Sequence, residues 1–163
     1  MRCPLVCHLL FFLPAWTLEA LAADPSAREM CYHSCQISLE PPRFNDTDPA
    51  SPRFAQSCLS RMKSVSLYLC LEVYCRGEYQ TEGLSSLNRT CLDNALPPLP
   101  PFDIIVNYTD DVISGLRYLQ RDEAVYTTIL GEVVVPSERL FNLSYRTQVI
   151  TTAPSRSDGQ PRG

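Results

Sequence analysis

The sequence predicts a mainly α-helical, disulfide-stapled module with irregular loops and a helical C-terminal extension, and three observations favour this fold class. The chain has 163 residues, of which 45% are hydrophobic and 20% charged, enough apolar material for a packed core. Apolar residues recur at the three- and four-residue spacing of helices. Six cysteines fall within residues 24–94, a density typical of small disulfide scaffolds.

Residues 1–23 have the pattern of a secretory signal peptide. Residues 5–16 are mostly apolar, and Ala20-Leu21-Ala22 has the small residues of a cleavage site. A membrane anchor is the alternative, but a span needs about 20 apolar residues, and Pro14 and Glu19 interrupt this one. We therefore expect cleavage at the end of this segment. The expected location is the secretory pathway, with the product extracellular or at the cell surface.

Six cysteines follow the signal peptide, separated by 3, 22, 11, 4 and 15 residues. An even number in an oxidising compartment predicts three disulfides, and the sequence leaves fifteen pairings open. A zinc site is the alternative, but it favours pairs separated by two residues and usually adds histidines, of which only His33 follows the signal peptide. The predicted disulfide cysteines are Cys31, Cys35, Cys58, Cys70, Cys75 and Cys91.

Four of the five asparagines lie in N-x-S/T sequons, an excess that supports passage through the secretory pathway. Asparagine as a turn or cap residue explains single positions but not the excess. The predicted glycosylation sites are Asn45, Asn88, Asn107 and Asn142.

The cysteines belong to a predicted helical module of residues 24–96. An exposed, proline-rich loop over residues 40–53 separates its first helix from the rest. The apolar run of residues 67–71 is expected to be buried, with a short strand as the alternative to helix. The predicted helical segments are residues 24–39, residues 54–76 in one or two pieces, and residues 81–93.

A stiff, proline-rich connector at residues 97–101 leads into the helical extension of residues 102–147. A peptide-recognition ligand is the alternative interpretation of the proline run. Residues 102–106 are expected to form a short strand or a docking segment. Thr109 is expected to cap a helix that runs from Asp110 to about Leu119.

The remaining extension is predicted to contain an extended segment and a final helix. Residues 133–136 are β-branched and end in proline, which favours an extended conformation. The last helix is expected to begin at Ser137 and Glu138. Residues 148–163 lose apolar periodicity, and we predict that they form a disordered tail.

The residues offer little for catalysis or cofactor binding. The net charge is −4 and the arginines are scattered, which argues against nucleic-acid binding. Phosphate-cradling glycine loops and nucleophile elbows are missing from the sequence. His33 lies between two cysteines that are expected to be oxidised, so a histidine–thiolate pair is not expected. We predict no catalytic, cofactor or metal residues. A small secreted hydrolase that uses two carboxylates is the remaining enzymatic alternative.

Several short motifs in order resemble one known family across residues 28–147. They are Cys31-x3-Cys35, Phe44-Asn45-Asp46-Thr47-Asp48-Pro49, Ser66-Leu67-Tyr68-Leu69-Cys70, Tyr74-Cys75, Leu87-Asn88-Arg89-Thr90-Cys91, Asn107-Tyr108-Thr109-Asp110-Asp111, and Leu140-Phe141 with Arg146-Thr147. In this arrangement the chain resembles the extracellular N-terminal region of fungal ferric-chelate reductases, the ferric reductase transmembrane components.

The resemblance implies a role in iron uptake. In that family a membrane domain binds two haems, and a cytosolic part binds FAD and NADPH, so this chain would carry none of the redox cofactors. Its implied partner is the membrane domain of a ferric reductase. The chain departs from the family after residue 147, where a polar tail replaces the first membrane helix, so the resemblance implies truncation or an early end of the reading frame. The rival hypothesis is a free secreted glycoprotein that binds a protein or glycan.

Overall fold

The computed structural model describes residues 25–76 and 81–152, and in these ranges the protein is mainly helical, as predicted. The predicted signal peptide, residues 1–23, lies outside the described residues. The helices are α1 (Pro25–Leu39), α2 (Arg53–Leu59), α3 (Arg61–Cys75), α4 (Glu82–Asp93), the 3-10 helix η1 (Phe102–Ile105), α5 (Asp110–Ser114) and α6 (Glu138–Thr152). The strands are β1 (Arg43–Phe44), β2 (Arg117–Leu119), β3 (Ile129–Leu130) and β4 (Val134–Pro136).

Helix α3 lies at the centre of the molecule and is buried on almost every side. Its middle turns, residues 67–71, are helical rather than a strand, and all five side chains are buried. The predicted helix over residues 54–76 is divided at Ser60, whose extended backbone separates α2 from α3. Ser60 caps α3 by accepting a hydrogen bond from the Lys63 amide, and Asp46 accepts from the Ser60 hydroxyl (2.6 Å) and the Met62 amide (2.8 Å).

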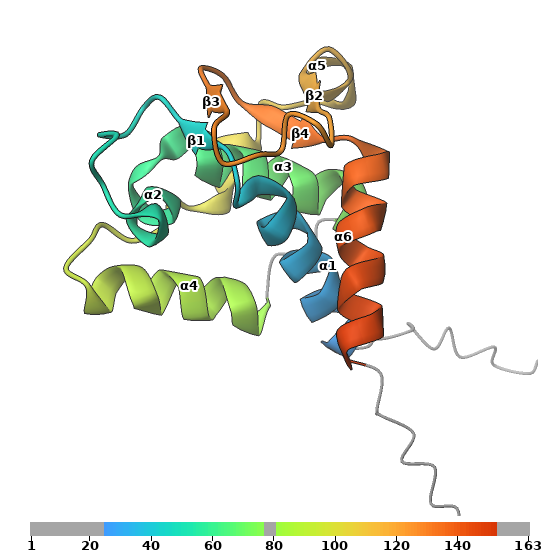
Figure 1. Cartoon of the computed structure of the whole chain (residues 1–163), viewed down its shortest axis with the longest axis horizontal. Helices are drawn as coiled ribbons and strands as arrows, with labels where there is room; N and C mark the ends of the chain where they lie inside the picture. Colours follow the sequence, from blue (N-terminus) through green and yellow to red (C-terminus); the bar gives the residue numbers. More distant parts are fainter. Residues whose placement is uncertain (1–24, 77–80, 153–163) are drawn as a thin grey trace, which may run out of the picture.

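Helices α1 and α6 lie side by side in antiparallel orientation (Figure 1). A small polar contact joins them, because the hydroxyls of Ser38 and Ser144 lie 3.0 Å apart within the interface. Phe141 of α6 stacks on Tyr74 of α3 with ring centroids 4.3 Å apart. The final helix is thus packed on both α1 and α3.

Two small parallel sheets, each of two strands, lie at the top of the molecule in the view of Figure 1, above helices α1 and α3. Strand β1 pairs with β3, and β2 pairs with β4 with Leu119 opposite Pro136. The second sheet is attached to α3 by a side chain, since the Val134 amide donates to the Ser66 hydroxyl oxygen at 3.0 Å. Short strands suffice here because each pair is completed by contacts with the helical core.

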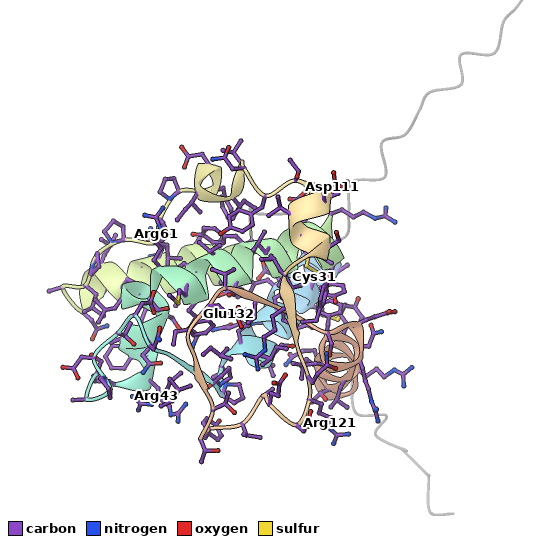
Figure 2. The ribbon with its side chains drawn as sticks, turned by 90° about the horizontal axis from the view of Figure 1, so that it is seen from above. Cys31, Arg43, Arg61, Asp111, Arg121 and Glu132 are labelled. Atoms are coloured by element: carbon purple, nitrogen blue, oxygen red, sulfur yellow. A yellow bond between two sulfur atoms is a disulfide. The ribbon has the colours of Figure 1, made fainter. Side chains whose placement is uncertain are left out.

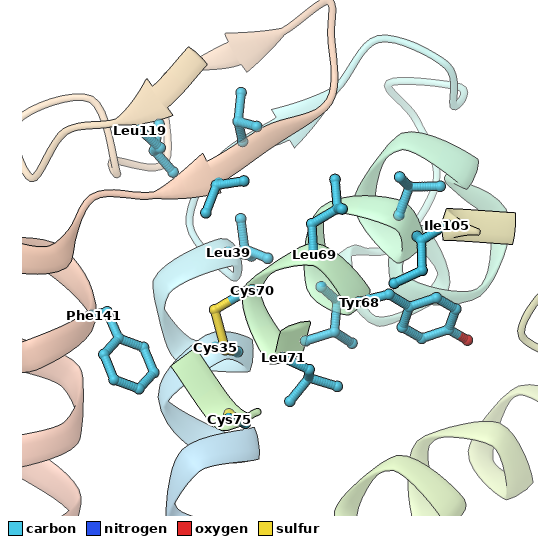
Figure 3. Packing of buried hydrophobic residues seen from close by; sticks show 14 of the residues in the cluster. Cys35, Leu39, Tyr68, Leu69, Cys70, Leu71, Cys75, Ile105, Leu119 and Phe141 are labelled. Atoms are coloured by element: carbon cyan, nitrogen blue, oxygen red, sulfur yellow. A yellow bond between two sulfur atoms is a disulfide. The ribbon is translucent and has the colours of Figure 1, made fainter. Parts of the chain in front are cut away.

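One hydrophobic core joins the two predicted segments, residues 24–96 and 102–147. It combines buried side chains from α1 and α3 with others from the second half of the chain (Figure 3). Leu39, Leu69 and Leu71 surround the Cys35–Cys70 disulfide, while Leu119 and Phe141 reach the same core from β2 and α6. The extension therefore folds onto the cysteine-rich module.

One prediction about the second half was wrong, and another was confirmed in only one of its alternatives. The predicted helix from Asp110 to Leu119 ends at Ser114, because residues 117–119 pair with β4 and bury Leu119 in the core. The hydrogen bonds between β2 and the sequence-distant β4 therefore determine the conformation of residues 117–119, although their local apolar spacing favours a helix. Thr109 takes the cap position with extended backbone but makes no side-chain cap hydrogen bond. Residues 102–105 form the 3-10 helix η1 rather than a short strand, and η1 packs on α3, as the docking alternative predicted.

The predicted disordered tail begins too early. Helix α6 continues through residues 148–152, which the loss of apolar periodicity assigned to the tail. The backbone hydrogen bonds of a helix continue over polar residues, so an end in apolar periodicity does not mark the end of the helix. The rest of the predicted tail, residues 153–163, lies outside the described residues.

Candidate binding site

Three disulfides hold the helices around the site, as the cysteine count predicted. Two join α1 to α3 and one joins α2 to α4, with Cα–Cα distances between 5.6 and 5.9 Å. The spacing of four along α1 places both of its cysteines on the face toward α3. The pairs are Cys31–Cys75, Cys35–Cys70 and Cys58–Cys91.

A cavity of about 400 Å³ lies between the disulfide-linked helices; we call it the Lys63 cavity. All four helices α1, α2, α3 and α4 contribute to its wall, and the C-terminal end of α1 adds a carboxylate. The residues lining it are Tyr32, His33, Gln36, Glu40, Arg53, Phe54, Ser57, Lys63, Gly83, Ser86, Leu87 and Thr90.

Lys63 is the only lysine of the chain, and it stands in the first turn of α3. The residue is only 9% exposed, and its side chain makes no hydrogen bond or ion pair with another described residue. Burial lowers the pKa of the Lys63 amine to about 8. The nearby carboxylate of Glu40 opposes this change, and the guanidinium of Arg53 adds to it.

The other charged groups of the cavity are held in place by their own contacts. Arg53 donates to the carbonyl oxygens of Pro41 (2.8 Å) and Tyr126 (3.1 Å), and its guanidinium lies 4.4 Å from the centroid of the Tyr126 ring. This fixes a second positive charge at the wall of the Lys63 cavity. Glu40 provides the single carboxylate among the lining residues.

His33, the one histidine after the predicted signal peptide, contacts two neighbours on its own helix α1. Its ring packs edge-on against Tyr32 at 5.1 Å, and Nδ1 lies 3.4 Å from the amide oxygen of Gln36. The neighbouring Cys31 and Cys35 are both oxidised. Among the described residues, no three His, Cys, Asp or Glu side chains gather as a metal site.

A second, larger hollow of about 860 Å³ runs between α4 and the proline-rich connector; we call it the α4 groove. Two hydrogen bonds shape it. The Tyr68 hydroxyl donates to the Pro100 carbonyl (2.6 Å), and the Leu99 amide donates to the side-chain oxygen of Asn88 (2.9 Å). The proline run is therefore a fixed wall of this groove rather than a projecting ligand.

The four predicted glycosylation sites all have solvent access, although their settings differ. Asn45 and Asn107 are exposed in turns, as bulky surface modification favours. Asn142 is exposed in the middle of α6. Asn88 is half-buried on α4, where it lines the α4 groove. Glycosylation at these four positions stays a prediction.

Sequence reasoning did not single out the Lys63 cavity. A charged residue in a helix is normally solvated, so the sequence gives no reason to expect burial of Lys63, which lies between Met62 and Ser64. One available signal was compositional, since a chain with thirteen arginines has a single lysine, located in its most apolar helix. The cavity itself depends on how four helices pack, which helical periodicity does not report.

Comparisons with known proteins identify no relative for this arrangement. No family model matches the chain, no curated protein matches it, and no solved structure matches it. Within residues 25–76 and 81–152, none of the helices has the length and apolar character that a bilayer crossing requires.

Proposed function

We propose that this chain is a non-catalytic extracellular domain of a fungal plasma-membrane ferric-chelate reductase, acting in iron uptake. The observation that carries the extracellular assignment is the set of three interhelical disulfides, because such bonds persist in oxidising compartments. Four solvent-accessible sequons support the same location.

The reductase assignment rests on the motifs that resemble that family, and several residues of these motifs have structural roles in this fold. Asp46 of the Asn-Asp-Thr motif caps α3, and Ser66 of the Ser-Leu-Tyr motif accepts a hydrogen bond from the Val134 amide. Tyr74 donates to the Pro136 carbonyl at 2.7 Å. These residues hold the fold together, so motifs shared in this order would specify a common domain architecture rather than a shared catalytic site.

In this proposal the chain acts as an external cap on a membrane partner. Electron transfer would take place in the haem-bearing membrane domain and in the part that binds FAD and NADPH, while this domain would shape the access of ferric chelates. The decisive experiment is to sequence the gene beyond the codon for Thr147, where the resemblance ends. An in-frame continuation with apolar helices that carry paired histidines is expected, and a stop codon followed by no such exon would refute the assignment.

A biochemical experiment tests the non-catalytic part separately. We expect the purified, secreted chain to be colourless, without a haem Soret band or flavin absorbance, and to show no NADPH-dependent reduction of ferric chelates. A bound chromophore together with turnover above a protein-free control would contradict the proposal.

The second candidate function is a free secreted glycoprotein that binds a protein or a glycan, and the α4 groove favours it. This groove is open, mixed in polarity and bordered by Phe102 and the proline run, features that suit an extended ligand. A stop codon in the transcript combined with retention of the chain on a glycan or cell-wall matrix would favour this candidate over the reductase.

A further inference from the structure

The wall of the Lys63 cavity contains an unusual residue, a largely buried lysine whose amine forms no ion pair with a described side chain. Lysine is almost never buried unless it is paired, because taking an ammonium out of water is unfavourable. Lys63 as a whole is 9% exposed, and its amine has no hydrogen-bond or ion-pair partner among the described residues. The amine is not among the fully buried unpartnered side-chain atoms, so the tip of the side chain reaches the space of the cavity. Its side chain lines the cavity, so a molecule in that space would contact it.

The charges around the cavity favour a negatively charged occupant. Lys63 and Arg53 face it from α3 and α2, and Glu40 faces it from the end of α1. Two cations opposed by one carboxylate leave a positive balance. A metal cation would be repelled by this pair, and a neutral sugar would leave the Lys63 ammonium uncompensated.

The polar side chains of the wall suit a carboxylate. Ser57 on α2 can donate one hydrogen bond and Gln36 on α1 can donate two, and both side chains line the cavity beside Lys63. A carboxylate has two oxygens that accept such bonds in addition to the ammonium. The volume of about 400 Å³ lies within the range of small-molecule sites and is large enough for an anion of several carboxylates.

The cavity is also preorganised. The Cys35–Cys70 disulfide links α1 to α3, and the Cys58–Cys91 disulfide links α2 to α4, so covalent bonds connect its walls in pairs. A rigid site loses little conformational entropy when it binds its ligand.

We propose that the Lys63 cavity is a binding site for a small carboxylate-bearing anion, with the Lys63 ammonium as the charged anchor and Ser57 and Gln36 as hydrogen-bond donors. This proposal rests on the cavity alone and stands whether or not the chain belongs to a ferric reductase.

The first experiment uses the single lysine as a reporter, with citrate as the probe. The native secreted protein is treated with an amine-reactive ester, and labelling of the peptide that contains Lys63 is followed by mass spectrometry. Saturating citrate is expected to slow labelling of Lys63 at least fivefold, while the α-amino terminus keeps its rate. An unchanged Lys63 rate in saturating citrate would overturn the proposal.

The second experiment compares two variants of the same helix turn by calorimetric titration. Lys63→Met removes the anchor charge, and Arg61→Met is the matched control, because Arg61 is exposed two residues earlier in α3 (Figure 2). Citrate is expected to bind the wild type and Arg61→Met alike, and Lys63→Met at least tenfold more weakly. Equal affinity in all three proteins would overturn the proposal.

Competition by other anions tests the chemical class. Acetate and inorganic phosphate are titrated against bound citrate at equal ionic strength. Weak competition by both is expected, because neither supplies several carboxylates. Phosphate that displaces citrate at equal concentration would contradict the carboxylate assignment. If Lys63→Met fails to fold, the labelling experiment on the wild-type protein decides the matter by itself.

Discussion

The two halves of the molecule are held in different ways. The disulfide-linked part, α1 to α4, contains all three disulfides, whereas the C-terminal part, residues 102–152, contains none. The C-terminal part is attached by apolar packing, by the pairing of β3 with β1, and by side-chain hydrogen bonds such as those that Tyr74 and Ser66 make with the backbone around β4.

The two parts also differ in whether their buried polar groups have hydrogen-bond partners. In the disulfide-linked part, the Tyr32 hydroxyl and the side-chain nitrogen of Gln56 are enclosed without a partner among the described residues. The contacts that anchor the C-terminal part are satisfied, as in the Ser38–Ser144 pair. An enclosed polar group without a partner lowers stability, and in the disulfide-linked part the stabilisation by the disulfides offsets this cost.

The largest expected effect comes from removing a central disulfide. Cys35→Ala with Cys70→Ala opens a loop whose ends are 35 residues apart, which lowers the free energy of unfolding by about 4 kcal/mol on the loop-entropy relation. Urea unfolding followed by circular dichroism measures the loss. Because α6 packs on α1, hydrogen exchange should show lost protection in α6 as well.

The matched control is Cys58→Ala with Cys91→Ala, which opens a loop of similar size, 33 residues, between α2 and α4. Its loss of stability should be similar, but α6 should keep its protection, since this disulfide does not touch the helices that support α6. Equal loss of protection in α6 in both double variants would contradict the comparison.

The next effect is a cavity made in the C-terminal part. Phe141→Ala removes a nearly buried ring that stacks on Tyr74, and we expect a loss of about 3 kcal/mol. Hydrogen exchange should increase in α6 and β4, while α1 and α3 stay protected. Leu143→Ala is the control, since Leu143 is 42% exposed on the same helix, and it should change stability by less than about 1 kcal/mol.

Lys63→Met is expected to stabilise the disulfide-linked part at neutral pH. The pKa of Lys63 is lowered to about 8 in the folded protein from an ordinary 10.5, so the unfolded chain binds its proton more strongly. The resulting destabilisation is complete below pH 8 and disappears as the pH rises toward 10.5. At about 1.4 kcal/mol per pKa unit, the variant should gain roughly 3 kcal/mol at pH 7.

The titratable and charged groups that line the cavity with Lys63 are Tyr32 and His33 from α1, Glu40 from its end, and Arg53 from α2. Stability is measured by urea unfolding at several pH values between 7 and 10.5, in buffers without carboxylates. Arg61→Met should track the wild type throughout. A gain in Lys63→Met that is independent of pH would show that added apolar burial, rather than the enclosed charge, is its cause.

A smaller effect is expected from one hydrogen bond that attaches β4. Tyr74→Phe leaves the stack on Phe141 in place but removes the donor to the Pro136 carbonyl, which should lower stability by about 1 kcal/mol. Tyr126→Phe is the control at an exposed tyrosine. Thermal unfolding of the two variants measures the difference, and equal midpoints would argue against a role for this bond.

The smallest effect separates the glycan on Asn88 from the structural role of its side chain. Thr90→Ala destroys the sequon but leaves the Asn88 oxygen bonded to the Leu99 amide, so stability should change by less than about 0.5 kcal/mol. Asn88→Ala loses both, and should cost about 1 kcal/mol more. Gel mobility before and after deglycosylation reports occupancy, and an unchanged band for Thr90→Ala would show that Asn88 carries no glycan.

The sequence by itself determined the class of the fold and the content of its first half. Apolar spacing predicted α1, α4 and the buried helix α3, because each of these helices presents a face with local periodicity to one core. The cysteine count predicted three disulfides, because oxidised cysteines pair in even numbers, but the count cannot select one pairing among fifteen.

Only the tertiary structure decided the pairing, the course of the second half and the candidate site. Cys35 pairs with Cys70 because α1 and α3 pack in one relative position, and residues 117–119 become a strand because β4 lies beside them. The Lys63 cavity arises where four helices meet. Each of these features depends on contacts between residues far apart in the chain, and a local sequence pattern does not encode the distances across which they form.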